Sequence, residues 1–303
     1  MNICEMISEN DGLKISFAEF LPEGAPRAIM QIAHGMCEHK ERYFPFMEKL
    51  AASGYAAVIN DHRGHGASVK TNDDLGWFDD LALLDDMAQL TRKYKARFPG
   101  IPCMLIGHSM GSLASRVYLK KHDELLDGLI LTGCPTKSSA ASAGLVLIGA
   151  MTKLRGDRYV SSGISDLICG SFAKPFKSEN SPFAWLNSDR NEVAKYEADP
   201  LCGFPFKLKG NASLVRLMRD TYTNGGWQLK KPDLPILFLS GGDDPCMGTE
   251  AKLKQAVGHL KTVGYGDVSY KLYPGMRHEV LFEPEHEKVE RDIFSALDQI
   301  SNK

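Results

Sequence analysis

One serine in this sequence has neighbours that suit it to nucleophilic chemistry. Ser109 lies at the centre of GHSMG (107–111), and the spacing G-x-S-x-G is typical of a nucleophile elbow. The apolar run 101–106 has the character of a strand, and residues 112–122 place apolar side chains at helical spacing. In so tight a turn the hydroxyl points outward, and the first amides of the helix face the group that it attacks. We therefore predict that Ser109 is a catalytic nucleophile.

A serine hydroxyl is a weak nucleophile unless an imidazole removes its proton and a carboxylate orients that imidazole. Asp243 and Asp244 directly follow one later apolar run, and His278 comes shortly after the next. Because the carboxyl ends of parallel strands meet at one edge of a sheet, we expect both loops to lie beside Ser109. We predict His278 as the general base and Asp244 as the orienting acid, with Asp243 as a turn residue. The alternatives are structural: a cap for either aspartate and an ordinary loop position for the histidine.

The oxyanion formed in acyl transfer needs two amide donors. One should follow the nucleophile, on Met110. The second should come from the loop after the first central strand, where Gly35 lets the backbone turn its next amide inward, so we predict Met36. Both roles belong to the backbone, so the two methionine side chains could simply pack or could line an acyl pocket.

Short apolar strands alternate with helices over residues 1–134 and 227–303, which predicts an α/β fold whose mostly parallel sheet has helices on both faces. Asp11-Gly12, between two segments of strand character, predicts an opening hairpin. Between 135 and 226 the alternation stops, and the sequence instead offers a helix of small residues over 138–154 and several aromatic-rich pieces. We interpret residues 135–226 as a helical cap inserted over the sheet.

Composition argues against several classes of partner. The 303 residues carry 36 basic and 38 acidic side chains without a basic stripe, so we expect no nucleic-acid partner. Seven scattered cysteines and an N-terminus without a signal-peptide pattern predict a reduced, cytoplasmic protein. The longest apolar stretch, 140–151, is too short to span a bilayer. His62 and His65 have H-x-x-H spacing without further ligands, so we predict neither a metal site nor a cofactor.

Five motifs, in this order along the chain, resemble those of the α/β-hydrolases in the group of monoacylglycerol lipases, lysophospholipases and S33-like serine aminopeptidases. They are AHGMCEHKERY (33–43), DHRGHGAS (61–68), GHSMGS (107–112), PILFLSGGDDP (235–245) and YPGMRHE (273–279).

The resemblance implies the same assignments: Ser109, Asp244 and His278 as a catalytic triad, the amides of Met36 and Met110 as the oxyanion hole, and residues 135–226 as the cap. It also implies a supporting polar network of Glu38, His39 and Arg42 behind the oxyanion loop. A buried Glu38 needs a cation beside it, which Arg42 or Arg63 could supply.

The activity that the resemblance implies is hydrolysis of carboxylic esters through an acyl-enzyme, most closely that of a monoacylglycerol lipase or lysophospholipase on single-chain lipid esters. A short-chain carboxylesterase with the same triad is an alternative. A non-catalytic binding member of the fold is another, although it would have a broken triad and here every position is filled. The apolar residues 145–148 of the cap either pack on the sheet domain or form a rim that transiently meets an acyl chain, a micelle or a membrane.

Overall fold

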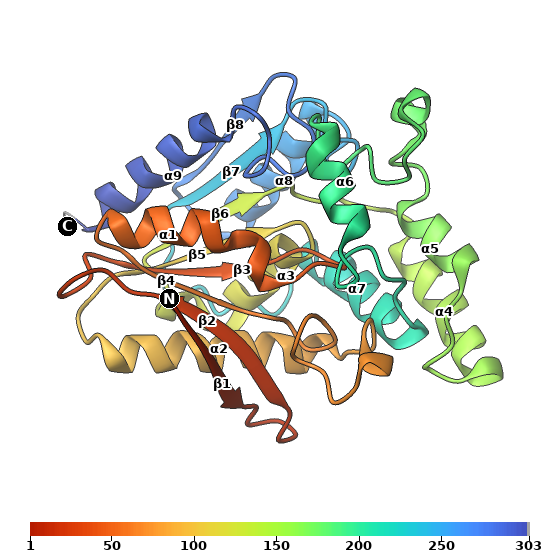
Figure 1. Cartoon of the computed structure of the whole chain (residues 1–303), viewed down its shortest axis with the longest axis horizontal. Coiled ribbons are helices and arrows are strands. Elements are labelled where there is room, and N and C mark those ends of the chain that lie inside the picture. The colour runs from red at the N-terminus through yellow and green to blue at the C-terminus, as the bar shows by residue number, and fades with distance from the viewer. Residues whose placement is uncertain (302–303) are drawn as a thin grey trace.

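The computed structural model describes residues 1–301 of the chain. Eight strands form one sheet in the order β1-β2-β4-β3-β5-β6-β7-β8 (Figure 1). The strands β1 (Asn2–Ile7) and β2 (Lys14–Phe20) form an antiparallel hairpin, and β2 is also antiparallel to β4. All other neighbours are parallel, which confirms the predicted mostly parallel sheet. These strands are β3 (Ile29–Ala33), β4 (Ala56–Asn60), β5 (Cys103–His108), β6 (Gly128–Thr132), β7 (Ile236–Gly241) and β8 (Val268–Tyr273).

Helices cover both faces of the sheet, and every residue of the four central strands β3 to β6 is buried. Successive side chains of a strand point to opposite faces, so the interior is divided into two clusters. One cluster joins Leu105 to α2 (Asp80–Arg97), α3 (Met110–His122) and α8 (Glu250–Val263). The other joins Ile106 to α1 (Phe44–Ala52) and α9 (His286–Ser301), which lie together on the opposite side in Figure 1.

Between β6 and β7 the chain leaves the sheet and forms four helices beyond the carboxyl ends of the strands (Figure 1). They are α4 (Ala141–Arg155), α5 (Ser162–Cys169), α6 (Arg190–Ala198) and α7 (Leu208–Thr221). The helix α7 joins the insertion to the main domain, because Leu217 packs in the main interior and Val215 packs with Ile148 of α4. Within residues 1–301, no helix combines the length and the apolar character needed to cross a membrane.

The turn from β5 to α3 is so tight that only glycine fits at two of its positions. Ser109 has φ 50° and ψ −114°, a left-handed φ that is strained for a residue with a side chain. A Cβ on Gly107 would lie 2.5 Å from the carbonyl oxygen of Gly111, and a Cβ on Gly111 would overlap the carbonyl oxygen of Ala33 on β3. The two glycines therefore let α3 begin directly against the backbone of the neighbouring strand.

We predict that Gly111→Ala lowers the free energy of unfolding by about 3 kcal/mol, because the β3 backbone cannot move aside for the added methyl group. Gly149→Ala is the matched control: Gly149 lies inside α4, and no heavy atom outside its own helix turn lies within 4 Å of the position of its Cβ. Alanine there should raise the free energy of unfolding by up to about 1 kcal/mol. Urea unfolding measures both changes, and equal stability of the two variants would contradict the steric account of the turn.

Candidate active site

A histidine and an aspartate on neighbouring loops form a buried pair beside the turn of Ser109. Nδ1 of His278, after β8, donates to Oδ2 of Asp244, after β7, across 3.0 Å. Both residues are 1% exposed, whereas Asp243 lies at the surface. The other carboxylate oxygen of Asp244 accepts the Cys246 amide at 2.8 Å, which fixes its orientation. The structure therefore pairs the histidine with Asp244, which the sequence favoured, and leaves Asp243 outside the pair.

The second nitrogen of this imidazole is not bound by the described part of the protein, and the residue lies beside the same cavity as Ser109. Nε2 of His278 is buried and has no hydrogen-bond partner within residues 1–301. Ser109 and His278 both line the cavity described below. Burial by itself lowers the pKa of His278, but the negative charge of Asp244 and its hydrogen bond outweigh burial and raise the pKa above the ordinary value of 6.5. The arrangement thus provides an oriented imidazole with a free nitrogen and a strengthened affinity for a proton.

In the loop after β3, hydrogen bonds fix the peptide groups on both sides of Gly35. Nδ1 of His34 donates to the carbonyl oxygen of Gly35 at 2.8 Å, and the amide of Gly35 donates to Oε1 of Glu38 at 2.5 Å. Because the C=O and N–H of a trans peptide point in opposite directions, the bond from His34 turns the amide of Met36 away from the His34 ring. Within residues 1–301 neither this amide nor that of Met110 donates to another protein group. This role of His34 was not predicted from the sequence, although its place directly before Gly35 was a usable signal.

A buried arginine connects the loop after β3 to the loop after β8. Nη1 of Arg42 contacts Oε2 of Glu38 at 2.6 Å, and its two terminal nitrogens contact both oxygens of Glu279 at 2.7 and 2.9 Å. The carboxylates are 1% and 3% exposed, so each needs the cation to remain charged. Arg42 is therefore the partner of Glu38, while Arg63 binds Asp86 at 2.8 Å elsewhere. Glu279 was not predicted as a member of this network, because nothing in the linear order links it to Glu38.

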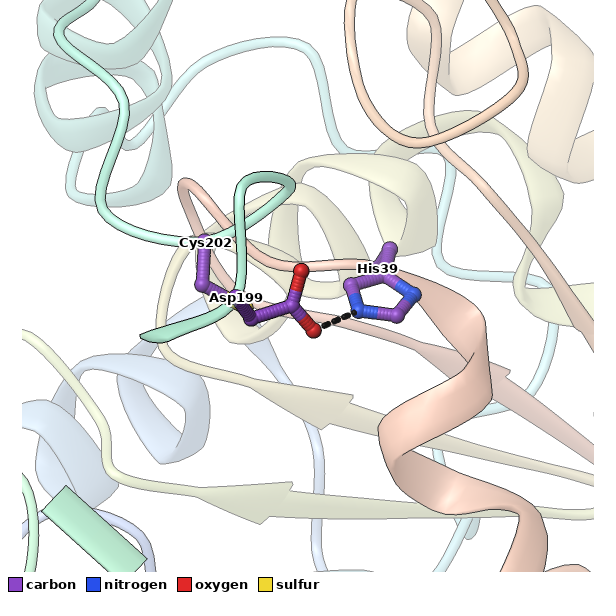
Figure 2. Close-up of side chains that lie close together, drawn as sticks. All are labelled: His39, Asp199 and Cys202. Carbon is purple, nitrogen blue, oxygen red and sulfur yellow. Dashed lines mark hydrogen bonds and ion pairs between the residues drawn. The ribbon is translucent and has the colours of Figure 1, made fainter. Parts of the chain in front are cut away.

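Three other histidines that the sequence singled out lie outside this network. His39, expected to be part of it, instead points its Nε2 at Oδ2 of Asp199 in the insertion, 2.8 Å away (Figure 2). His62 and His65 pack around His34, with ring centroids 4.2 and 5.3 Å from it. Burial lowers the pKa of His62 to about 3 and that of His65 to about 4, so both rings are neutral parts of the interior.

Above Ser109 lies a cavity of about 390 Å³, within the range of small-molecule sites. The insertion supplies much of its wall, and the ring of Trp185 lies 4.7 Å from that of His278. Two contacts hold this part of the insertion in place: the Glu279 amide donates to the Leu186 carbonyl at 2.8 Å, and Arg277 binds Glu179 at 2.6 Å. The apolar side chains around the cavity include Met36, Ile168, Phe183, Trp185, Leu186 and Phe204.

A strained serine between a strand and a helix, with a histidine–aspartate pair on later strand ends of a mostly parallel sheet, defines an α/β-hydrolase. Comparison with known proteins specifies the family: residues 24–285 match the family described as serine aminopeptidase, S33, and the chain belongs to it.

Two curated relatives and one solved structure cover nearly the whole chain. The chain is 27% identical to a monoacylglycerol lipase of Mycolicibacterium smegmatis over 94% of this chain and 93% of the relative. It is 28% identical to a probable lysophospholipase L2 of Haemophilus influenzae, over 98% and 91%. A carboxyl esterase of Bacillus coagulans, solved in complex with glycerol, superposes with a TM-score of 0.91 at 25% identity, over 99% of this chain and 98% of that one.

We predict that Asp244→Asn lowers the pKa of His278, because it removes the negative charge and leaves the effect of burial. In the wild type the ring should titrate above the ordinary 6.5, and in the variant below its wild-type value. NMR of the imidazole Cε1–H signal as a function of pH measures both. Asp243→Asn, at the exposed neighbouring position, is the control and should leave the pKa of His278 unchanged. A pKa that Asp244→Asn does not lower would contradict the coupling.

Proposed function

We propose that this protein is a serine hydrolase that cleaves carboxylic esters carrying a single acyl chain, as a monoacylglycerol lipase does. The observation that carries the proposal is that Ser109 and the His278–Asp244 pair open onto one largely apolar cavity. The names of the similar proteins, a monoacylglycerol lipase and a carboxyl esterase, support the same chemistry.

In the proposed reaction Oγ of Ser109 attacks the ester carbonyl while Nε2 of His278 takes its proton. Asp244 holds the imidazole and stabilises its protonated form. The amides of Met36 and Met110 donate to the oxyanion, which they can do without first breaking a bond to the protein. His278 then protonates the departing alcohol and activates the water that releases the acid from Ser109. Each step uses groups of the chain and water, with no cofactor.

A free amine, the ligand of an aminopeptidase, fits the cavity less well than a neutral ester does. Recognition of an ammonium group calls for a carboxylate that is not already paired. Glu38 and Glu279 line the cavity, but Arg42 binds both. Asp166, on the wall formed by α5, is exposed to solvent, where an ion pair contributes little. The charges around the cavity therefore favour an uncharged substrate.

Residues 135–226 act in this proposal as a cap that contacts lipid surfaces. Their helices leave large apolar side chains in solvent: Val146 and Leu154 of α4 are 75% and 82% exposed, and Leu167 of α5 is 64% exposed. Such side chains lower the free energy when they enter the boundary of a bilayer or micelle. The contact is transient and peripheral. All seven cysteines are free thiols, in keeping with a cytoplasmic site of action.

The double substitution Val146→Ser/Leu154→Ser should weaken binding to phosphatidylcholine vesicles by about tenfold, because two exposed apolar groups no longer enter the lipid. Co-sedimentation measures the binding. Leu81→Ser is the control, since Leu81 is 62% exposed but lies on α2 of the main domain. Equal losses in the two proteins would contradict a lipid-facing cap.

A series of p-nitrophenyl esters from acetyl to palmitoyl tests the substrate class. Each methylene that enters the cavity contributes about 0.8 kcal/mol, so kcat/KM should rise roughly fourfold per methylene until the chain fills the cavity. Monoacylglycerols of the preferred length should also be cleaved. Ser109→Ala should lower kcat by a factor on the order of 10⁵ to 10⁶ without unfolding the protein.

A maximum at acetyl or butyryl would instead identify a short-chain carboxylesterase, the second candidate. The similarity to a carboxyl esterase of Bacillus coagulans supports ester hydrolysis in both cases. Retention of activity in Ser109→Ala would overturn the proposed mechanism for either substrate. Complete inactivity of the wild type on every ester would indicate a binding protein of the same fold.

A further inference from the structure

Three side chains outside the cavity bring different metal-binding atoms together. The ligand atoms of His39, Asp199 and Cys202 all lie within 4.8 Å of one another (Figure 2). His39 comes from the loop after β3, and the other two come from the turn that follows α6, about 160 residues later. The cluster therefore lies where the insertion meets the loop that carries Met36.

The backbone around this cluster holds the three groups in place. Oδ1 of Asp199 accepts the Leu201 amide at 2.8 Å, and the Cys202 amide donates to the Asp199 carbonyl at 3.0 Å, so the turn is closed by two bonds. Oδ2 is the oxygen that faces His39. The Cys37 carbonyl accepts the Gly203 amide at 2.9 Å, which ties the two segments together next to the cluster. Such outer bonds are what orients metal ligands in proteins.

The cluster is largely buried but remains accessible from one side. The side chain of His39 is 7% exposed and that of Asp199 is 31% exposed. A second cavity of about 250 Å³ is lined by Asp199 and Cys202, with the carboxylates of Glu41 and Glu192 on its wall. Arg42 and Lys195 also line this cavity, so its charges are mixed. The cavity offers an entry path and room for a water molecule as fourth ligand.

We propose that His39, Asp199 and Cys202 form a zinc-binding site that joins the insertion to the loop after β3. Nitrogen, oxygen and sulfur ligands in a set of three with one open position suit tetrahedral Zn²⁺, whereas a thiolate ligand disfavours Mg²⁺ and Ca²⁺. On binding, the Cys202 thiol releases its proton to solvent. The His39 ring, whose Nε2–H donates to Asp199 in the metal-free protein, transfers that proton through water to Nδ1 and then binds the ion through Nε2. The carboxylate and thiolate then carry two negative charges, which balance the ion.

A second group of three, Asp244, Cys246 and His278, also brings ligand atoms within 4.8 Å, but it belongs to the candidate active site. Zinc bound there would block the imidazole directly, so inhibition by zinc alone does not identify the site. A Cys246→Ser background removes the thiol of that second group. Binding measured in this background reports on the cluster at His39 and does not depend on the proposed catalytic activity.

The test titrates metal-free Cys246→Ser protein with Co²⁺ and with Zn²⁺, and compares it with the same protein carrying Cys202→Ser, Asp199→Asn or Cys4→Ser. Cys4 lies on β1, outside both groups, and serves as the matched control. Co²⁺ should give a thiolate-to-metal absorption band in the background protein and in Cys4→Ser, and none in Cys202→Ser. Zinc affinity, from competition with a chelating dye, should fall at least about tenfold in Cys202→Ser and in Asp199→Asn.

Circular dichroism and thermal unfolding in chelator check that each variant is folded. If Cys202→Ser does not fold, the background protein and Asp199→Asn, which keeps the shape of the side chain, decide the question. Undiminished zinc affinity in a folded Cys202→Ser or Asp199→Asn protein would overturn the proposal. Absence of both zinc binding and the cobalt band in the Cys246→Ser background would overturn it as well.

Discussion

The close contact between the start of α3 and the backbone of β3 is the constraint on which the rest of the site depends. Gly111 lies against the carbonyl group of Ala33 with no space for a side chain, and this contact leaves Ser109 in a left-handed conformation. The surrounding parallel strands and α3 must supply the energy that the strained residue costs. The turn places Ser109 at the carboxyl end of β5, next to the amide of Met110 and to the loop after β3.

Pairing of buried charges holds the loops after β3 and β8 together beside this turn. Two buried carboxylates, Glu38 and Glu279, share the single guanidinium of Arg42, and one of them also accepts the Gly35 amide. Removal of the cation would leave two unpaired buried charges, a loss of about 3 to 5 kcal/mol for a broken buried pair. The network thereby links the loop that carries Met36 to the residue directly after His278. Groups that a catalytic cycle would use together are held together by one arginine.

The insertion contributes the part of the cavity wall that lies outside the sheet domain. It supplies Trp185 and Ile168 to the cavity wall, and it is fixed to the main domain by α7, by Arg277 and by the contacts near His39. A fold of this kind keeps one set of reacting groups and changes substrate by changing what covers them. In the proposed function, the side chains that the insertion adds to the cavity wall would select the substrate.

Local sequence determined the elements and the order of the reacting groups. The alternation of apolar runs, the glycines around Ser109 and the positions of Asp244 and His278 after strands follow from short-range sterics and periodicity, which neighbouring residues specify. Helix ends moved by a few residues, as at α4, which begins at Ala141 instead of 138, because terminal turns depend on tertiary contacts.

Only the tertiary structure decided which charged and polar groups meet. Arg42 pairs with Glu279 across 237 positions of sequence, and His39 faces Asp199 across 160, so neither contact leaves a local signal. The same holds for the choice between Asp243 and Asp244, since adjacent aspartates differ only in which of them the folded loop buries. Which charged residue becomes buried, and which residue it contacts, is decided when distant segments pack. The linear order therefore specified the reacting residues but not the hydrogen bonds and ion pairs that connect them.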